Sequence, residues 1–574
     1  MPMDDAKNSI GHAMAGLIRP YRYMLMVILV ALVVLSCLNL AMPKVMKYML
    51  DDIFVAPEAP ADVAMSLRVR RLGGVILVVF IIYAAKNALF FFSKSRVVVV
   101  GERVAFDLRQ RLIGHLHTLS VDFYQQNKPG KISARVMQDV ESVKGFIQDE
   151  LAAVAINVLM LFVAAGIMLH NQFWLAVLSL GVMPCHVLTY WLFRKPIATY
   201  ARQAKEGIAN VSGDLLEQFN GAATVKASAT QLIEQEKLRQ SMRSSMRAQI
   251  KQSRYYVLQK VAADLLVGIG RMVLLGVGGY RVLSGRMSVG DFVEFYGYLG
   301  LLYPRLLDLV SQSGKFTRAA TSMERVFEIL HLTPDVVENA KAIPHEITAG
   351  RIEFQNVSFS YGANRVLEEV SFAIEPKEHV LVTGPSGAGK SSCVNLIPRF
   401  YDPSQGRILI DGVDVRDFTL TALRRQIGVV FQDGFLFNAT VMANIRYAWP
   451  QASDDAVVEA ARRAYAHEFI QKLPDGYMTL IGEGGVQLSQ GEKRRLMIAR
   501  AILKNPRILL LDEPLVSLDA QARQGAIEGL STLIRNRTVL TISHYPAELP
   551  YADKQIHISD SHVSVRDLTG RILR

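Results

Sequence analysis

A glycine-rich segment in the second half of the chain has the residue types needed to hold phosphate groups. The segment Gly384–Ser391 reads Gly-Pro-Ser-Gly-Ala-Gly-Lys-Ser, follows the apolar run Val380–Thr383 and precedes a helical pattern. Glycines let backbone N–H groups approach phosphate oxygens, Lys390 supplies a point charge, and the Ser391 hydroxyl is a ligand for Mg²⁺. This strand, loop and helix order predicts a P-loop. We expect it to hold the phosphates of ATP through Gly384, Pro385, Ser386, Gly387, Ala388, Gly389, Lys390, Ser391 and Ser392.

Two adjacent carboxylates follow a second apolar run. The segment Arg507–Leu511 leads directly into Asp512 and Glu513. Phosphoryl transfer depends on positioning and on charge stabilisation, so we expect Asp512 to hold the Mg²⁺ shell and Glu513 to polarise the attacking water. Taken alone, two acids after a strand are more often a solvated strand end.

A third motif links these two segments to a known family. Leu488–Glu492 reads Leu-Ser-Gln-Gly-Glu and is followed by the basic run Lys493–Arg495. It resembles the signature motif of the ATP-binding cassette (ABC) ATPases. The whole chain is similar to half-size ABC exporters, which include the lipid A flippase and multidrug exporter families.

The resemblance implies further site residues. Tyr361 would stack on adenine, Gln432 would sense Mg²⁺ and the attacking water, and His544 would contact the γ-phosphate. Asp519 matches the residue that communicates between two ATP sites. In the family, ATP lies between two cassettes, so the nucleotide held by a second copy would meet Ser489, Gln490 and Gly491.

Several residues depart from the family pattern. Glu492 stands where glutamine is common, and Gln490 stands where glycine is usual. The other departures from the usual residues are Gly484, Val516, Ser517 and Tyr545.

The first half of the chain has the apolar runs of a membrane domain. We expect crossings at Tyr23–Pro43, at Leu72–Ser93, twice within Leu151–Phe193, and at about 261–280 and 292–311. The two crossings of the third run would turn at His170-Asn171-Gln172. Lysine and arginine are abundant in 94–150 and 194–260, which predicts that both loops, both termini and the ATPase domain are cytoplasmic.

The cytoplasmic loops have the three-to-four apolar spacing of helices. The resemblance makes Leu119–Asn127 and Glu217–Val225 the two coupling helices, and Leu17–Tyr23 is predicted as an interfacial helix. The predicted domains are 1–335 for the membrane domain, 336–349 for a linker and 350–574 for the ATPase.

Ionisable residues in membrane spans usually face a cavity or a partner. Lys86, Arg271 and Arg305 are therefore candidate cargo-binding residues, and their sign suggests an anionic or amphipathic substrate. Pairing of Arg271 with Asp264, and of Arg305 with Asp308, is an equally open reading.

The resemblance implies an ATP-driven exporter or flippase that works as a homodimer by alternating access. The chain has 574 residues, a net charge of +12 and 51% hydrophobic residues, which excludes disordered, collagen-like and disulfide-stapled classes. Partners would be the lipid bilayer, a lipid or amphipathic substrate and a second copy, but no nucleic acid. A bacterial inner membrane is the simplest location. The alternatives are export of a peptide or oligosaccharide, and one half of a heterodimeric or ATP-gated ABC system.

Overall fold

The protein consists of two compact units. The computed structural model describes residues 16, 19–54, 61–362, 364–432, 434–482, 484–515, 520–543, 552–559 and 562–568. The first unit holds the described residues up to 116 together with 129–331, and the second holds 117–128 together with the described residues from 332 onward. The first is helical and the second is α/β, as the sequence predicts.

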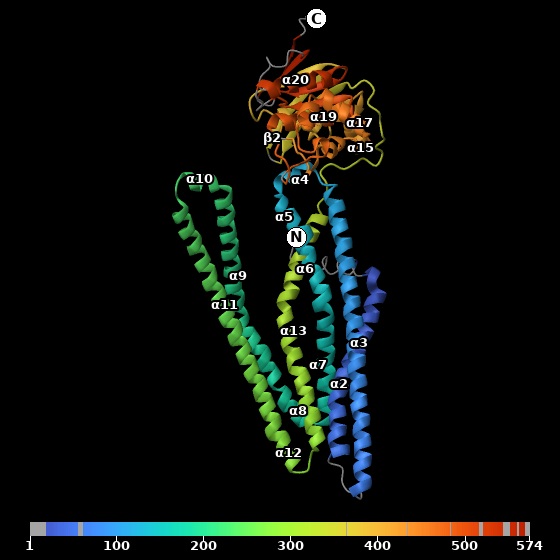
Figure 1. Ribbon diagram of the computed structural model, residues 1–574, viewed down its shortest axis with the longest axis vertical. Coiled ribbons are helices and arrows are strands. Elements are labelled where there is room, and N and C mark those ends of the chain that lie inside the picture. Colours follow the sequence, from blue (N-terminus) through green and yellow to red (C-terminus); the bar gives the residue numbers. More distant parts are fainter. Residues whose placement is uncertain are drawn as a thin grey trace. The chain divides into compact units, whose positions relative to one another are not determined.

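Long helices build the first unit (Figure 1). They are α2 (Arg22–Tyr48), α3 (Ala61–Leu116), α7 (Ala152–Asn171), α8 (Phe173–Leu180), α9 (Val182–Asn220), α11 (Gln231–Val273) and α13 (Val289–Leu330). Shorter helices are α5 (Pro129–Ala134), α6 (Val140–Gly145), α10 (Ala222–Ala227) and α12 (Gly279–Leu283). Single turns of 3-10 or π geometry are η1 (Arg19–Tyr21), η2 (Met49–Phe54), η3 (Arg135–Asp139), η4 (Phe146–Leu151) and η5 (Leu274–Gly278).

Five helical stretches among the described residues are long and apolar enough to cross a membrane. They are Arg19–Phe54, Met65–Leu116, Pro129–Asn171, Phe173–Asn220 and Gln231–Leu283. The break at Gln172, between α7 and α8, confirms the predicted turn. The predicted crossing at 292–311 lies within α13, which is not one of these five stretches because the charged residues Glu294, Arg305 and Asp308 lower its hydropathy.

Helix α13 packs into the core of the first unit despite those acids. Tyr298 and Leu299 are fully buried, and the Tyr298 hydroxyl donates to the backbone oxygen of Leu40 at 3.3 Å. The hydroxyl of Tyr303 donates to the backbone oxygen of Ser179 at 3.0 Å. A Cβ at Gly270 would stand 2.0 Å from the Tyr303 hydroxyl, so a glycine is needed there for α11 to approach α13.

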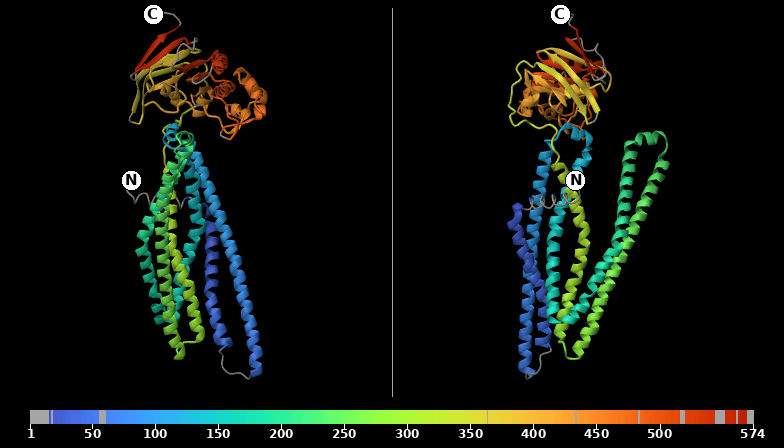
Figure 2. Two further views of the ribbon diagram at one scale, coloured as in Figure 1. Left: turned by 60° about the vertical axis from the view of Figure 1, so that its left-hand side comes forward. Right: turned by 180° about the vertical axis from the view of Figure 1, so that it is seen from behind.

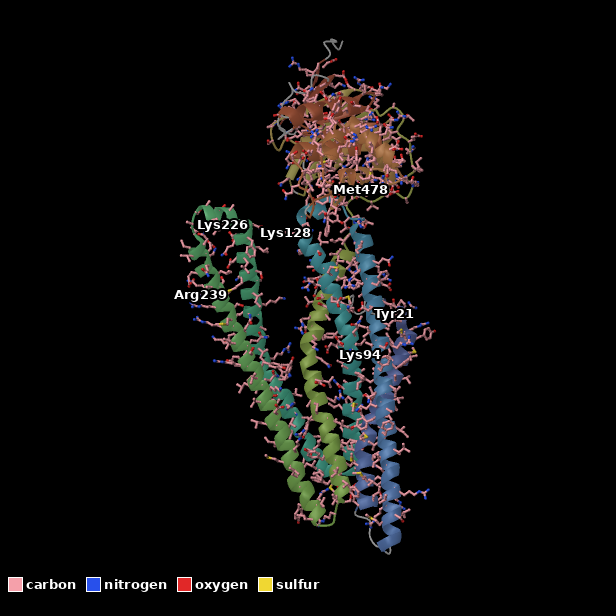
Figure 3. The ribbon with its side chains drawn as sticks, viewed as in Figure 1. Tyr21, Lys94, Lys128, Lys226, Arg239 and Met478 are labelled. Carbon is pink, nitrogen blue, oxygen red and sulfur yellow. The ribbon has the colours of Figure 1, made fainter. Side chains whose placement is uncertain are left out.

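Helices α9 and α11 lie side by side and are joined by α10 (Figure 1). Gly207 allows this close contact, since a Cβ at that position would lie only 2.9 Å from the Ser245 Cβ. The rings of Tyr200 and Tyr255 stack between them with centroids 5.5 Å apart. Figure 3 labels Lys226 on α10, at the end of this helical hairpin.

Two main sheets build the second unit (Figure 2). The six-stranded sheet has the order β12-β11-β3-β10-β9-β6, and its strands β11, β3, β10, β9 and β6 are parallel. Its strands are β3 (His379–Thr383), β6 (Ile427–Val430), β9 (Ile508–Asp512), β10 (Thr538–Ile542), β11 (Lys554–Ser559) and β12 (His562–Asp567). The antiparallel sheet β2-β1-β4-β5 contains β1 (Ile352–Tyr361), β2 (Asn364–Ile374), β4 (Gln405–Ile410) and β5 (Val413–Asp414).

Helices complete the second unit. They are α14 (Lys390–Leu396), α15 (Leu420–Gln426), α16 (Val441–Arg446), α17 (Asp454–Arg463), α18 (His467–Gln471), α19 (Gln490–Lys504) and α20 (Ala520–Ile534). The turns η6 (Val415–Asp417) and η7 (Gly476–Met478) and the small sheet of β7 (Ala439–Thr440) and β8 (Leu480–Ile481) connect them. The central parallel strands are buried along their whole length, which is why they read as continuous apolar runs in the sequence.

A short helix from the first half of the chain belongs to the second unit. Helix α4 (Val121–Gln126) lies inside the predicted coupling helix Leu119–Asn127. Gln125 accepts a hydrogen bond from the Tyr401 hydroxyl at 3.3 Å, and Ser120 donates to the carboxylate of Asp335. The second predicted coupling helix, at 217–225, covers the end of α9 and most of α10.

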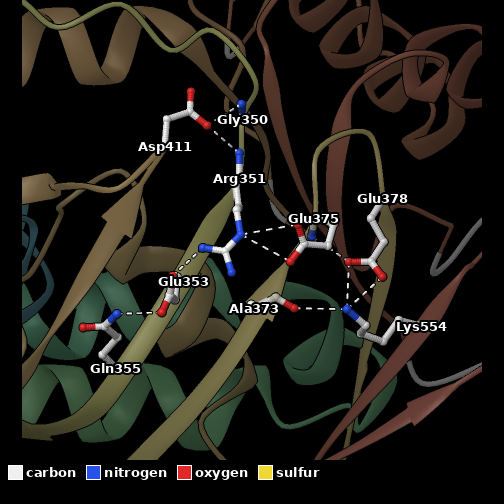
Figure 4. A network of polar contacts seen from close by, with 9 residues as sticks. All are labelled: Gly350, Arg351, Glu353, Gln355, Ala373, Glu375, Glu378, Asp411 and Lys554. Atoms are coloured by element: carbon white, nitrogen blue, oxygen red, sulfur yellow. Dashed lines mark hydrogen bonds and ion pairs between the residues drawn. The ribbon is translucent and has the colours of Figure 1, made fainter. Parts of the chain in front are cut away.

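A single carboxylate anchors the segment that enters the ATPase fold (Figure 4). Asp411 accepts hydrogen bonds from the backbone N–H groups of Gly350 and Arg351, both at 2.8 Å. It also accepts from the N–H groups of Thr348 at 2.9 Å and Ala349 at 3.0 Å. Four donors on one carboxylate satisfy backbone groups that no strand pairs, so the start of β1 is held in place.

Candidate functional site

The P-loop occupies the turn between β3 and α14, as predicted. Gly384 has a φ of +149°, and a Cβ there would stand 2.1 Å from the backbone oxygen of Ile558. Gly389 has a φ of +96°. These two glycines are therefore required by the backbone path itself, because L side chains rarely adopt such angles.

The P-loop lysine is held inside the loop. Lys390 is buried, and its Nζ donates to the backbone oxygens of Gly384 at 3.0 Å and Pro385 at 2.8 Å. Pro385, Ser386 and Gly387 are exposed at the crest, and the Ala388 N–H donates back to the Pro385 oxygen at 3.2 Å. Two backbone oxygens therefore hold the ammonium group at the loop, where its positive charge suits a phosphate chain.

The two carboxylates after β9 have different partners. Asp512 accepts a hydrogen bond from the Ser391 side chain, so the two predicted Mg²⁺ ligands lie together. Burial and the neighbouring charge of Glu513 raise the pKa of Asp512 above its usual range. Glu513 accepts from Nε2 of Gln432 at 2.8 Å, which brings the predicted water-polarising and water-sensing residues together.

Glu513 also has a strained backbone. Its φ is +45°, an angle that is uncommon for any residue other than glycine. Its N–H donates to the backbone oxygen of Ile542 at 3.0 Å, at the end of the adjacent strand β10. Such strain is found where a functional group must be aimed in one direction.

The sequence does not reveal the residue that holds the loop of Gln432. Arg494 is buried, and its guanidinium donates to the backbone oxygens of Phe431 at 2.6 Å and Gln432 at 2.9 Å. Only its place in the basic run after the signature motif hinted at a function. This contact joins α19, which begins at the signature motif, to the loop after β6.

The predicted adenine-stacking residue belongs to an aromatic cluster. The Tyr361 ring makes edge contacts with Phe359 and Tyr401, with centroids 4.7 Å and 5.1 Å apart. Its hydroxyl accepts from the Ser392 hydroxyl at 3.4 Å, which ties the cluster to α14. Ser392 itself is buried beneath the P-loop.

The signature residues form the start of α19. Ser489 caps the helix: its Oγ accepts from the Glu492 N–H at 3.3 Å and donates to Oε2 of Glu492 at 2.9 Å. Ser489 and Gln490 are exposed, whereas Gly491 is buried. The acid at position 492, a departure from the family, thus takes the serine hydroxyl as a partner.

Two predicted site residues, His544 and Asp519, lie outside the described residues, as do Val516, Ser517 and Tyr545. Gly484 is described and lies close to Asn438, whose Nδ2 would be 3.5 Å from a Cβ at that position.

The candidate cargo residues are spread over three helices. Nζ of Lys86 lies 5.5 Å from the Tyr83 ring centroid, and Arg271 is exposed on α11. Arg305 donates to Oδ1 of the buried Asn157 at 3.1 Å, so its partner is on α7.

None of these three residues lines the cavity of about 630 Å³ between α9, α11 and α13. The cationic groups in that cavity are Arg194 and Lys260, which lie next to the ends of the predicted spans Leu151–Phe193 and 261–280. Aromatic side chains also line it, namely Tyr190, Trp191 and Tyr256.

Comparison with known proteins agrees with this geometry. Residues 25–305 match the family described as ABC transporter transmembrane region, and residues 367–516 match the family described as ABC transporter. The "Putative multidrug export ATP-binding/permease protein" of Staphylococcus aureus (strain NCTC 8325 / PS 47) is 34% identical over 548 residues, 95% of this chain and 94% of the relative. The protein of the same description named YgaD, from Bacillus subtilis (strain 168), is 32% identical over 547 residues, 94% of this chain and 92% of the relative.

A solved structure shares the whole architecture. The structure of a bacterial Atm1-family ABC exporter with ATP bound superposes with a TM-score of 0.79 at 26% identity, covering 95% of this chain and 94% of that one. The chain belongs to the half-size ABC exporters, integral membrane proteins in which an ATPase domain couples ATP hydrolysis to transport.

Proposed function

We propose that two copies of this chain form a Mg²⁺-dependent exporter that moves an anionic amphipathic substrate out of the cytoplasm or the inner leaflet of a bacterial inner membrane. The main support for ATP hydrolysis is the hydrogen bond between Gln432 and Glu513. A second hydrogen bond joins Ser391 to Asp512, the residue next to Glu513.

The donor set of the ATP site fits a magnesium ion. Mg²⁺ prefers oxygen ligands, and Ser391 and Asp512 offer a hydroxyl and a carboxylate that already touch. When bound, the ion neutralises phosphate charge. Glu513 then has the task of orienting and polarising the attacking water, with Gln432 fixing the carboxylate's direction. His544 is the proposed γ-phosphate contact.

Exposed surfaces support the homodimer. The crest of the P-loop and Ser489 of the signature motif are both exposed, so each can meet the complementary part of a second copy. Apolar side chains are also exposed at the α9–α10–α11 end, where Phe219 is 71% and Leu232 80% exposed. Phe435 in the second unit is 69% exposed. Isolated monomers rarely leave such groups uncovered together.

The cavity between α9, α11 and α13 supports the substrate class. Arg194 and Lys260 supply two positive charges, against the one carboxylate of Asp308 in the lining. Tyr190, Trp191 and Tyr256 supply apolar ring surface. Nε2 of His186, which is buried in the cavity wall, has no hydrogen-bond partner among the described residues. Cations beside aromatic faces suit a molecule with an anionic head and an apolar body. Lys86, Arg271 and Arg305 remain candidates for further contacts along its path.

The catalytic proposal is tested by measuring Mg²⁺-dependent ATP hydrolysis by the purified chain in lipid nanodiscs. Glu513→Gln keeps the shape of the side chain and should lower kcat by about a hundredfold or more. Glu468→Gln, an exposed acid on α18, is the matched control and should hydrolyse ATP at the normal rate. Normal hydrolysis by Glu513→Gln would contradict the catalytic role of Glu513. No hydrolysis by the unaltered chain alone would contradict a self-sufficient homodimer.

The substrate class is tested by stimulation of that ATPase activity. An alkyl phosphate should stimulate hydrolysis more than an alkyl glucoside of the same chain length, and Arg194→Ala with Lys260→Ala should abolish that preference. Arg271→Ala with Arg305→Ala tests the two candidates named from the sequence. Arg243→Ala with Arg247→Ala, two exposed cations on α11, is the control. Equal loss of response to both compounds would contradict recognition of the anionic group.

A further inference from the structure

A basic cavity lies at the edge of the parallel sheet opposite the P-loop. Strands β6, β9 and β10 begin at this edge and end near the ATP site. The cavity has a volume of about 940 Å³. We call it the strand-start cavity. Five cationic side chains and one carboxylate, that of Glu346, are among its lining residues; the cations are Arg425, Lys504, Arg507, Arg535 and Arg537.

Strand register brings several of these cations together. Parallel pairing sets Ile508 of β9 beside Thr538 of β10, so the preceding residues Arg507 and Arg537 are neighbours. The Thr538 N–H donates to the Arg507 backbone oxygen at 3.2 Å, and the Arg507 N–H donates to the Gln426 oxygen at 3.0 Å. The positive charge is therefore concentrated by the fold and is not scattered over a surface.

Two of the cations are fixed by the protein. Nζ of Lys504 donates to the backbone oxygens of Arg424 and Ile427, both at 2.7 Å. The Arg537 guanidinium donates to Oδ1 of Asn505 at 2.8 Å. Both side chains are partly buried, and this burial lowers the pKa values of Lys504 and Arg537.

The other three cations retain their hydrogen-bonding capacity. In the described part of the chain, the guanidinium groups of Arg425, Arg507 and Arg535 donate to no protein acceptor, and all three side chains are exposed. A guanidinium offers a planar pair of N–H donors that matches the oxygens of a phosphate group. Like charges held close together repel one another, and an anion with several charges would relieve that repulsion.

The other walls limit the size and kind of ligand. Gln426 binds the predicted linker 336–349, which we call the interdomain segment: its Oε1 accepts from the Ile347 N–H at 2.6 Å, and its Nε2 donates to the His345 backbone oxygen at 2.9 Å. The lining also includes Trp449, whose side chain is 48% exposed. An exposed indole beside cations is a platform on which an aromatic base can stack. The volume suits a small molecule.

We propose that the strand-start cavity binds a soluble small molecule that carries two or more phosphate groups. The site is separate from the P-loop and independent of the transported substrate. Its ligand contacts the interdomain segment, the sheet edge and the loop after α16 at the same time, so binding ties these three parts together.

The probe is inorganic tripolyphosphate, titrated calorimetrically into the full chain in zwitterionic nanodiscs, in buffer with EDTA and no Mg²⁺. Lys390→Ala, which disables the P-loop, should leave tripolyphosphate affinity unchanged. Arg507→Gln with Arg535→Gln should weaken it at least about tenfold, since each change removes hydrogen bonds to a charged group. The control removes two exposed cations elsewhere, through Arg566→Gln with Lys472→Gln, and should alter affinity less than twofold.

Two results would overturn the proposal. Loss of tripolyphosphate binding in Lys390→Ala would assign the binding to the P-loop. Equal weakening in the Arg507/Arg535 pair and in the control pair would assign it to net charge.

A second arm of the experiment distinguishes a nucleotide from a simple polyphosphate. A non-hydrolysable ATP analogue is titrated into Lys390→Ala with and without Trp449→Ala. Tighter binding than tripolyphosphate that depends on Trp449 identifies a nucleotide ligand. Binding of both probes without dependence on Trp449 identifies a polyphosphate ligand. Failure of both probes to bind would also overturn the proposal.

Discussion

The hydroxyl of Tyr401 donates a hydrogen bond to Oε1 of Gln125 at 3.3 Å, while the Tyr401 ring lies against Tyr361. Gln125 is on α4, the helix within a predicted coupling segment, and Tyr361 is the residue expected to stack on adenine. Burial, aided by Tyr361 and the carboxylates of Asp122 and Asp335, raises the pKa of Tyr401 to about 12. Its hydroxyl therefore remains a donor throughout the neutral pH range.

Tyr401→Phe should weaken coupling without damaging the ATP site. We expect substrate-stimulated hydrolysis to fall about threefold because one hydrogen bond to α4 is lost, while the unstimulated rate and the KM for ATP stay within twofold. Steady-state ATPase assays in nanodiscs with and without substrate measure this. Tyr465→Phe, an exposed tyrosine of the same unit, is the control. An unchanged substrate-stimulated rate would show that the Tyr401–Gln125 hydrogen bond does not couple substrate binding to ATP hydrolysis.

Arg494→Gln should lower kcat for ATP hydrolysis by about tenfold, with little change in the KM for ATP. The longer guanidinium fixes the backbone at Phe431 and Gln432, so its loss lets Gln432 move away from Glu513. Arg494→Lys should restore part of the rate. Arg495→Gln, whose side chain bonds to the Tyr465 backbone, controls for general effects on α19. A rise in KM alone would argue against a positioning role for Arg494.

Glu492→Gln should improve ATP binding. Glutamine keeps the capping interaction with Ser489 but removes a negative charge from the surface that the resemblance places against the γ-phosphate. We expect the KM for ATP to fall about threefold. Glu492→Ala should instead lose the cap and lower thermal stability. A KM that rises or stays constant in Glu492→Gln would contradict the electrostatic argument.

Asp411→Asn should lower the melting temperature of the ATPase unit by about 5 °C at pH 7. Partial burial opposes ionisation, but N–H donors from Gly350, Arg351, Ala349 and Thr348 outweigh it and lower the pKa of Asp411. A lowered carboxyl pKa stabilises the fold above the unfolded value of about 3.9, and this stabilisation is lost as the pH falls through the folded value.

The difference in melting temperature between the normal chain and Asp411→Asn should therefore shrink below about pH 4. Differential scanning fluorimetry in nanodiscs measures it, with the exposed Asp455→Asn as control. A difference that is the same at pH 7 and at acid pH would show that the charge of Asp411 does not stabilise the fold.

Much of the ATP site could be predicted because its residues are local in sequence. The P-loop needs only a buried strand followed by glycines and Lys390, and the turn at Gln172 needs only an interruption in an apolar run. Contacts between elements that are far apart in the sequence produce no local sequence pattern from which they could be predicted. The partners of Arg494 are more than 60 residues away, and Arg507 and Arg537 meet only because β9 and β10 pair in register.

Helix α13 shows why hydropathy along the sequence does not mark the predicted crossing at 292–311. Two acids near its start are paired within the protein: Asp291, just before the predicted span, lies 2.5 Å from Nζ of Lys47 on α2, and Glu294 lies 3.8 Å from the same ammonium group. A sliding average along the sequence counts these acids as polar, but cannot count a cation that another helix supplies.

The membership of α4 in the second unit affects how the ATPase can be studied in isolation. A fragment that begins at residue 332 would lack 117–128, so Tyr401 would lose its acceptor Gln125 and Asp335 would lose its donor Ser120. The missing piece is short enough to be made as a synthetic peptide. Reconstituting the fragment with that peptide would turn a link within one chain into a binding equilibrium whose strength can be titrated.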